Sequence, residues 1–345
     1  MKAIVVRSPG GVEAMQLENI AEPQAARRDV VIKVETCGVC FHDVVTRNGT
    51  LKAGVKMPCV LGHEISGTVV EVGGEVTRFK AGERVATAQR YHICGSCRFC
   101  RSGREALCAE RKFLGDWGLV GGYGEYVAVE DDNVALVPEG VALADASIAA
   151  CAIGTLLNAV RDVGKVNIGE SVLVTGAGGG LGLHAIQVAR LAGAYVIAQT
   201  TSPEKVDLIR RMGAHEVVVH ARGEDFSGEV KRFTEGRGVD VLLDNVGTPL
   251  FEPMRRSLGI AGRWILIGQL SGQFIPFNPA QLFLKNQSML AVTSTSRNQL
   301  EDVLALMARG ALRGVVTRTL SLEEAGEAHR AVEAGRATGR ILLRP

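Results

Sequence analysis

Residues 171–182 read Ser-Val-Leu-Val-Thr-Gly-Ala-Gly-Gly-Gly-Leu-Gly, an apolar run that ends in a glycine-rich turn, and a helical pattern follows over 183–191. Such an apolar run is typical of a parallel strand buried on both faces. Glycines after it let the backbone approach a pyrophosphate at the N-terminus of the helix. The turn is not a strict G-x-G-x-x-G, because Ala177 holds the first position when Gly182 is taken as the last. The setting still predicts a dinucleotide-binding turn made of Gly176, Gly178, Gly179, Gly180, Leu181 and Gly182.

Downstream of this turn, apolar segments alternate with helical patterns. Alternating strands and helices are typical of a doubly wound α/β domain with a parallel sheet. A helical stretch over 144–163 precedes the region. Strands are predicted over 195–199, 216–219, 239–243 and 263–267, and helices over 204–212 and 249–258.

The first part of the chain has the two-residue period of β structure. Strands are predicted over 30–35 and 67–72, with glycine pairs marking turns. Many short strands with glycine turns indicate an antiparallel barrel or sandwich. The tail has predicted helices over 298–308 and 322–333 and a last strand over 340–343.

The end of the second strand of the α/β region bears on the choice of cofactor. Residues 199–205 read Gln-Thr-Thr-Ser-Pro-Glu-Lys, with no carboxylate at the strand end to bind the ribose 2′-hydroxyl of NAD. Hydroxyls and a lysine cation suit a 2′-phosphate, so NADP(H) is favoured over NAD(H). Two alternatives stay open: these are ordinary turn and N-cap residues, or Glu204 faces a ribose. The expected contacts are Thr200, Thr201, Ser202 and Lys205.

Composition sets limits on partners and compartment. The chain has 345 residues, 46% of them hydrophobic, and a net charge of +2, which suggests two domains and gives no electrostatic reason for nucleic acid or an anionic membrane as partner. No apolar run approaches the ~20 residues of a membrane span, and the N-terminal apolar run is too short for a signal peptide. We expect a cytoplasmic protein with a small-molecule partner, in which the eight cysteines serve as thiolates or buried apolar residues rather than disulfides.

Four of those cysteines lie within fifteen residues of one another, in a lobe over 90–112. Thiolates at such short separations can all reach one Zn²⁺ at about 2.3 Å, which indicates a closed, structural zinc site. A pair of disulfides and an iron–sulfur cluster are the rival interpretations. The last gap is too long for the bacterial cluster motif, and Ala109 rather than proline follows it. The ligands are predicted to be Cys94, Cys97, Cys100 and Cys108.

Cys40, His63 and Cys151 form a second candidate set. Two thiolates and one imidazole are three protein ligands for zinc, which leaves the fourth position for water or substrate. Asp43 can accept the second ring N–H of His63 and thereby fix its tautomer. Each residue alone has a plainer explanation, because a lone cysteine is usually a small buried apolar residue. The trio is persuasive only jointly.

Together these motifs give the chain a resemblance to the zinc-dependent alcohol dehydrogenases of the medium-chain dehydrogenase/reductase superfamily. The resemblance rests on Gly38-Val39-Cys40 with Asp43, on Gly62-His63-Glu64, on the four-cysteine lobe, on Cys151 and on the glycine turn. It implies a GroES-like catalytic domain from residues 1–150 and 288–345, wrapped around a Rossmann domain over 151–287, with the active site in the cleft.

The same resemblance assigns roles to residues. It implies that Cys40, His63 and Cys151 bind a catalytic zinc, and that Glu64 is a carboxylate able to approach the metal during ligand exchange. It gives Cys37 no ligand role, so we expect Cys37 to be a packing residue. It also implies a homodimer or homotetramer, with 290–293 as a candidate edge for sheet pairing. Further cofactor contacts are expected at Thr155, Asn245 and Gly268.

The implied chemistry is hydride transfer between NADP(H) and an alcohol, aldehyde or ketone, with zinc polarising the substrate oxygen. Members of the family commonly have Ser or Thr two residues after the first ligand cysteine, as part of a proton relay. This chain has His42 there. Histidine titrates near neutrality and can relay a proton itself, but the substitution narrows the pocket.

That departure keeps a second hypothesis about the enzyme open. Reductases of activated double bonds in the same superfamily, including acryloyl-CoA reductases, also have a Thr/Ser strand end and a bulky basic residue at this position. A third hypothesis is a catalytically silent NADPH-binding protein, similar to the lens members of the superfamily. Those members lack the catalytic zinc trio, which this chain retains.

Overall fold

The computed structural model describes all residues from Met1 to Pro345 and divides into two compact units. The first unit combines Met1–Gly154 with Ser294–Pro345, and the second comprises Thr155–Thr293. Cys151 therefore belongs to the first unit, together with Cys40 and His63. No helix combines the length and apolar character needed to cross a membrane.

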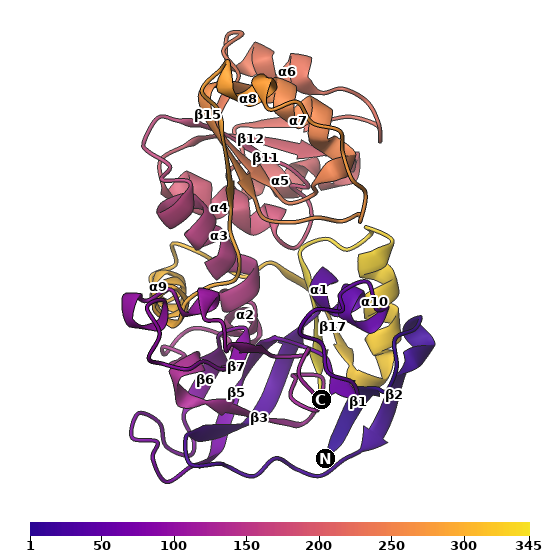
Figure 1. The fold of residues 1–345 in the computed structure, drawn as a ribbon, viewed down its shortest axis with the longest axis vertical. Coiled ribbons are helices and arrows are strands. Elements are labelled where there is room, and N and C mark those ends of the chain that lie inside the picture. The colour runs from indigo at the N-terminus through magenta and orange to yellow at the C-terminus, as the bar shows by residue number, and fades with distance from the viewer. The chain divides into compact units, whose positions relative to one another are not determined.

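The second unit contains a six-stranded parallel sheet in the order β13-β12-β11-β14-β15-β16 (Figure 1). The strand order reverses between β11 and β14, and the glycine turn follows β11 at this switch point, where α/β sheets bind ligands. The expected doubly wound sheet is confirmed. The strands are β11 (Ser171–Val174), β12 (Tyr195–Thr200), β13 (Glu216–Val219), β14 (Val239–Asp244), β15 (Leu258–Leu266) and β16 (Ser288–Ala291).

Helices α6, α7 and α8 lie along one side of this sheet and α4 along the other (Figure 1). The central strands are buried on both faces, with Leu173, Ile197 and Trp264 in the core. β15 begins five residues before the predicted 263, because Gly259 and Gly262 obscure its apolar pattern. The helices are α3 (Thr155–Leu157), α4 (Gly182–Leu191), α5 (Val206–Arg211), α6 (Ser227–Phe233), α7 (Phe251–Ser257) and α8 (Ala280–Phe283).

The first unit is built on a seven-stranded sheet in the order β10-β6-β5-β3-β18-β17, with β9 also paired to β3. All pairs are antiparallel except β17 with β18. The C-terminal strand pairs with β3 at Cys37 and Gly38, which brings the tail beside the segment that precedes Cys40. The strands are β3 (Asp29–Gly38), β5 (Glu64–Val72), β6 (Arg84–Thr87), β9 (Tyr126–Glu130), β10 (Val134–Leu136), β17 (Val316–Ser321) and β18 (Arg340–Arg344).

Two smaller sheets complete this unit. The order β2-β1-β4 forms one, and β7 with β8 forms the other. Their strands are β1 (Lys2–Val6), β2 (Met15–Asn19), β4 (Cys59–Val60), β7 (Arg90–His92) and β8 (Lys112–Phe113). The helices of the unit are α1 (Phe41–Arg47), α2 (Leu143–Ser147), α9 (Arg297–Ala308) and α10 (Ala325–Glu333).

The helix predicted over 144–163 is not regular. After α2 the chain forms a π-helical segment over Ala149–Gly154, and a second one covers Asn158–Val163 after α3. Such π-helical turns are rare and occur frequently at functional sites. Short 3-10 turns lie at Val12–Ala14, Cys100–Ser102, Glu105–Leu107, Asp131–Asn133, Pro203–Lys205, Thr248–Leu250 and Leu322–Glu324.

Candidate metal centre and cofactor site

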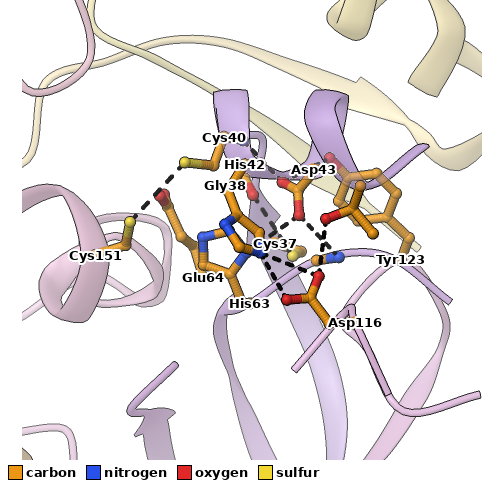
Figure 2. Close-up of polar contacts among 12 residues, drawn as sticks. Cys37, Gly38, Cys40, His42, Asp43, His63, Glu64, Asp116, Tyr123 and Cys151 are labelled. Atoms are coloured by element: carbon orange, nitrogen blue, oxygen red, sulfur yellow. Dashed lines mark hydrogen bonds and ion pairs between the residues drawn. The ribbon is translucent and has the colours of Figure 1, made fainter. Parts of the chain in front are cut away.

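Three separate segments bring the predicted ligands together in the first unit (Figure 2). Cys40 follows β3 as the N-cap residue of α1, His63 immediately precedes β5, and Cys151 lies in the π-helical segment. The ligand atoms of these residues and of Glu64 all lie within 4.8 Å of one another. Cys40 Sγ and Cys151 Sγ are 4.0 Å apart, far beyond disulfide length and close to the ~3.8 Å between two thiolates on one tetrahedral zinc.

Asp43 fixes the orientation of His63. Its Oδ1 lies 3.1 Å from His63 Nδ1 and accepts from the backbone N–H of Gly62 at 3.2 Å. Its Oδ2 accepts from the backbone N–H of Cys40 at 2.9 Å and from the hydroxyl of Tyr123 at 3.3 Å. Because Nδ1–H of the neutral ring donates to this carboxylate, the lone pair is on Nε2, and this buried atom has no hydrogen-bond partner. A buried acceptor left in this way is what a metal ligand requires.

The backbone before His63 depends on a glycine. Gly62 has a φ of +98°, and a Cβ there would meet the ring of Tyr123 and the sulfur of Cys37. Only glycine adopts this conformation without strain. Cys37 itself is fully buried in the core, and burial raises its pKa well above the ordinary value, so its thiol stays protonated.

The two thiols of the trio are electrostatically unequal. The hydrogen bond from Cys151 holds the pKa of Cys40 well below its usual range, against burial and with help from the charge of Arg340. The same hydrogen bond and burial raise the pKa of Cys151. One proton is therefore shared between two sulfurs. A metal ion that takes both as thiolates displaces that proton.

Arg340, at the start of β18, is a site residue that the sequence reasoning missed. Its Nη2 lies 2.8 Å from Glu64 Oε1, 3.9 Å from Cys40 Sγ and 3.8 Å from Cys151 Sγ. Burial raises the pKa of Glu64 to about 7 even though the Arg340 charge opposes this. The one available signal was an arginine opening an otherwise apolar strand, Ile341-Leu342-Leu343.

Asp116 is the second missed residue. Its carboxylate lies 2.8 and 3.0 Å from His42 Nε2 and accepts from the hydroxyl of Thr46 at 2.8 Å. Because a carboxylate only accepts, His42 Nε2 carries the proton and donates it. The His42 ring lies 5.2 Å from the ring of His63 and 4.7 Å from that of Phe113, so His42 is beside the candidate metal ligands. No local pattern linked Asp116 to His42, which is 74 residues away in sequence.

The four-cysteine lobe has the geometry of a closed tetrahedral site. Sulfur–sulfur distances are 3.6 Å for Cys94–Cys108 and Cys97–Cys100, and 3.9 Å for Cys94–Cys100. Four thiolates at 2.3 Å from one zinc stand about 3.8 Å apart. Backbone N–H donors of Cys97 and Ser96 lower the pKa of Cys94 to about 6, which favours the thiolate.

In the second unit, the glycine turn packs as a dinucleotide site requires. A Cβ on Gly182 would collide with the carbonyl oxygen of Gly176 and with Ala177, so helix α4 can meet the turn only at a glycine. Gly176 N donates to Gln199 Oε1 at 3.0 Å. Gly268, after β15, lies so close to the backbone of Asn245 that a Cβ would not fit.

Two expected cofactor contacts have buried polar atoms without partners. Thr155 Oγ1 and Asn245 Oδ1 make no hydrogen bond in the structure, although both are buried. Asn245 is held in place through Nδ2, which donates to the carbonyl of Thr175 at 3.0 Å. Buried polar atoms left over in this way are typical of a site that a polar ligand completes.

The end of β12 carries the residues expected at a 2′-phosphate. Thr200 Oγ1 accepts from the backbone N–H of Ser202 at 3.1 Å, Thr201 is exposed, and Lys205 is 8% exposed. A Cβ on Gly178 would fall 2.6 Å from Lys205 Cδ, which places the lysine stem against the glycine turn. Burial lowers the pKa of Lys205, against the charge of Glu204. A nearby anion would stabilise this ammonium.

Comparison with known families and structures gives a consistent result. Residues 26–139 match the family described as the alcohol dehydrogenase GroES-like domain, and residues 180–309 match the zinc-binding dehydrogenase family. The chain is 33% identical over 346 residues to a protein of Sulfurisphaera tokodaii named acryloyl-coenzyme A reductase, with all of both chains covered. It is 32% identical to a protein of Sulfolobus acidocaldarius named NAD-dependent alcohol dehydrogenase, which covers 100% of this chain and 99% of that one. A solved structure described as AibC matches with a TM-score of 0.92 and 40% identity, over 100% of this chain and 96% of that chain.

Proposed function

Because this chain belongs to the zinc-dependent alcohol dehydrogenases of the medium-chain dehydrogenase/reductase superfamily, we propose that it transfers a hydride between NADP(H) and an alcohol, aldehyde or ketone. Membership makes the chain an oxidoreductase and confirms the resemblance seen in the sequence. One observation carries the proposal further. Cys40, His63 and Cys151 converge on one point, at which the buried Nε2 of His63 has no partner within the protein.

Zinc fits this donor set. Cys40, His63 and Cys151 would hold it, and a bound zinc would supply a Lewis acid for a substrate oxygen. Asp43 keeps His63 in the Nδ1–H tautomer, so that Nε2 faces the metal position. Arg340 compensates the buried charge of Glu64, and its guanidinium lies near both sulfurs. A second zinc would occupy the four-cysteine lobe, where it would have no open position.

His42 is proposed as the residue that passes a proton between the substrate oxygen and solvent. Its ring lies beside that of His63, and its side chain is 30% exposed. Asp116 accepts from Nε2 and leaves Nδ1 as the second exchange position.

NADP(H) is the proposed cofactor. The hydroxyl-rich end of β12 and the buried Lys205 support a 2′-phosphate, and the unpartnered atoms of Thr155 and Asn245 support a bound nucleotide. Several relatives are named NAD-dependent alcohol dehydrogenases. Initial rates with NADPH and with NADH at equal concentrations would test this choice. A preference for NADH would refute it.

A second candidate is reduction of an enoyl thioester. The relative from S. tokodaii is named acryloyl-coenzyme A reductase. In this chain, one cluster of side chains suits an anionic substrate tail. Lys56 Nζ and Lys112 Nζ lie 5.3 and 5.2 Å from the ring centre of Trp117, and neither lysine forms an ion pair. Trp117 directly follows Asp116, the residue that pairs with His42, and the two cations lie against its indole. Phosphates would pair with the lysines and a flat base would stack on the indole.

One experiment separates the two. Oxidation or formation of NADPH would be measured with a panel of alcohols, aldehydes, ketones and enoyl-CoA thioesters, for the wild type and for Cys40→Ser. We expect carbonyl reduction in the wild type and none in the variant. NADPH consumption with enoyl-CoA alone, or carbonyl activity that survives loss of the metal, would overturn the first choice. Elemental analysis gives the metal count: two zinc ions per chain are expected, and one would favour a silent protein or a double-bond-reducing site.

Assembly and compartment are proposed together from the chain's own features. β16 is an edge strand of the second unit's sheet and can pair with a second copy, which supports a homodimer or homotetramer. All eight cysteines are free, which supports a reducing compartment such as the cytoplasm. Light scattering of the purified chain would test the assembly, and a monomer would refute it.

A further inference from the structure

A chain of hydrogen bonds extends away from the candidate metal centre through the interior of the first unit. From Asp43 it passes to the hydroxyl of Tyr123 at 3.3 Å, visible in Figure 2, and from there to His329 Nε2 at 3.1 Å. His329 Nδ1 lies 3.2 Å from Arg47 Nη1, and Arg47 Nη2 donates to Glu333 Oε1 at 2.6 Å. Apart from Glu333, these side chains are at most 2% exposed.

The residues at the two ends of this chain, Arg47 and Asp43, determine which atom donates and which accepts in every hydrogen bond between them. Arg47 has only donors, so His329 Nδ1 must accept and His329 must be neutral, with its proton on Nε2. That N–H donates to the oxygen of Tyr123, which leaves the tyrosine proton to be donated onward. The ionised Asp43 only accepts. All bonds therefore point from Arg47 toward Asp43.

The protonation states required are those that the surroundings favour. Burial lowers the pKa of His329 to about 4, against the charge of Asp43 and with a contribution from Arg47, so the ring is neutral at neutral pH. Burial raises the pKa of Tyr123, which keeps its proton. Asp43 accepts four hydrogen bonds, two from backbone N–H groups and two from the side chains of Tyr123 and His63, and such bonds favour the ionised carboxylate.

Asp43 accepts from both ends of this arrangement at once. Tyr123 and the backbone N–H of Cys40 fix Oδ2, while Oδ1 takes the N–H of Gly62 and that of His63 Nδ1. A carboxylate held at both oxygens cannot rotate. The imidazole that donates to it is consequently held in one tautomer and one orientation.

We propose that His329 and Tyr123 are positioning residues for the catalytic metal, acting through Asp43 to hold His63 Nε2 at the ligand position. His329 comes from helix α10 and Arg47 from the end of helix α1, so the C-terminal segment takes part in shaping the metal site. The inference rests on the proposed metal role of His63.

The test compares four variants as purified, zinc-loaded full-length enzymes. Tyr123→Phe removes only the donor to Asp43, and His329→Leu removes the polar link altogether. His329→Gln is the conservative variant, because its amide oxygen can accept from Arg47 while its N–H donates to Tyr123. Tyr126→Phe is the control: Tyr126 lies three residues away, and its hydroxyl has no hydrogen-bond partner.

Two readouts other than activity are used. Competition with a chelator measures the affinity for the more weakly held zinc, and cobalt substitution reports the geometry of the cysteine–histidine site through its visible absorption bands. We expect Tyr123→Phe and His329→Leu to weaken that zinc about tenfold, at the lower end of the effect of removing partners outside the ligand shell, and to shift the cobalt bands. His329→Gln and Tyr126→Phe should match the wild type.

The results of this test distinguish failure of the inference from failure of the proposed function. If Tyr123→Phe and His329→Leu hold zinc as tightly as the wild type with unchanged cobalt bands, the inference is wrong while the proposed function stands. If His329→Gln is as impaired as His329→Leu, the polar link is not what matters and the inference is likewise overturned. A wild type that contains only the four-cysteine zinc would overturn the proposed function, and this inference with it. Unfolding of His329→Leu alone would leave Tyr123→Phe and His329→Gln to decide.

Discussion

Acidification should destabilise this protein, because His329 is held neutral in the folded state and becomes protonated when the chain unfolds. Burial lowers the pKa of His329 to about 4 in the folded state, against 6.5 for an ordinary histidine. The charged groups around it are Arg47, Asp43, Glu333 and, at longer range, Cys40. As the pH falls below 6.5, the His329 side chain binds a proton in the unfolded chain but stays neutral in the folded chain. The stabilisation is therefore complete above pH 6.5 and is lost progressively down to pH 4.

The size of the effect follows from these two values. At pH 5.5 the unfolded histidine is about 90% protonated and the folded one almost not at all, which costs about 1.4 kcal/mol of unfolding free energy relative to pH 7.5. Urea unfolding of the wild type and of His329→Gln at both pH values gives the measurement. Other titrating groups cancel in the difference between the two proteins. If both lose the same stability between pH 7.5 and 5.5, His329 is not held neutral and the direction assigned to the hydrogen-bond chain is wrong.

Three further changes have definite expected outcomes. Cys108→Ser should lower the zinc content by one ion per chain and lower the melting temperature, because three thiolates no longer close a tetrahedral site; unchanged zinc content would contradict this. Lys205→Met should raise the KM for NADPH about tenfold or more while leaving that for NADH unchanged, since a charged hydrogen bond contributes roughly 1.5–3 kcal/mol; equal effects on both cofactors would rule out a 2′-phosphate contact. Gly182→Ala should destabilise the second unit by about 1–3 kcal/mol, because its Cβ would overlap Gly176 and Ala177; a melting temperature equal to that of the wild type would show that the turn can relax.

The fold was largely predictable because its signals are local. The apolar strand over 171–174 with its glycine turn, and the alternation that follows, are short-range patterns with a direct physical meaning. The irregular parts were not predictable in this way. The helical periodicity over 144–163 does not distinguish an α-helix from the π-helical segments that occur there. Residues 148–157 are apolar apart from Gly154 and Thr155, so they show no polar face from which a change of helical period could be read.

The residues of the candidate site were likewise predictable only where their signal is local in the sequence. Cys40, Asp43 and His63 stand near glycines at strand ends and could be proposed from sequence. Arg340 and Asp116 could not, because their roles depend on contacts across 276 and 74 residues respectively, and neither stands in a motif. In a sequence, a buried charged residue shows only as an interruption of an apolar pattern. An exposed charged residue in a loop gives the same signal, so the two are not distinguished.

The position of the three proposed ligands suggests what the metal adds to the structure. β3 and β5 pair from Val30 with Val72 to Gly38 with Glu64, with two register shifts along the ladder, and this pairing keeps Cys40 close to His63. Cys151 belongs to no strand and reaches the site from a π-helical segment. Two ligands are therefore brought together by backbone hydrogen bonds between strands, whereas no such ladder connects the third ligand to them. A metal bound by all three cross-links that segment to the sheet, so its stabilising effect should be concentrated around Cys151 rather than spread over the whole unit.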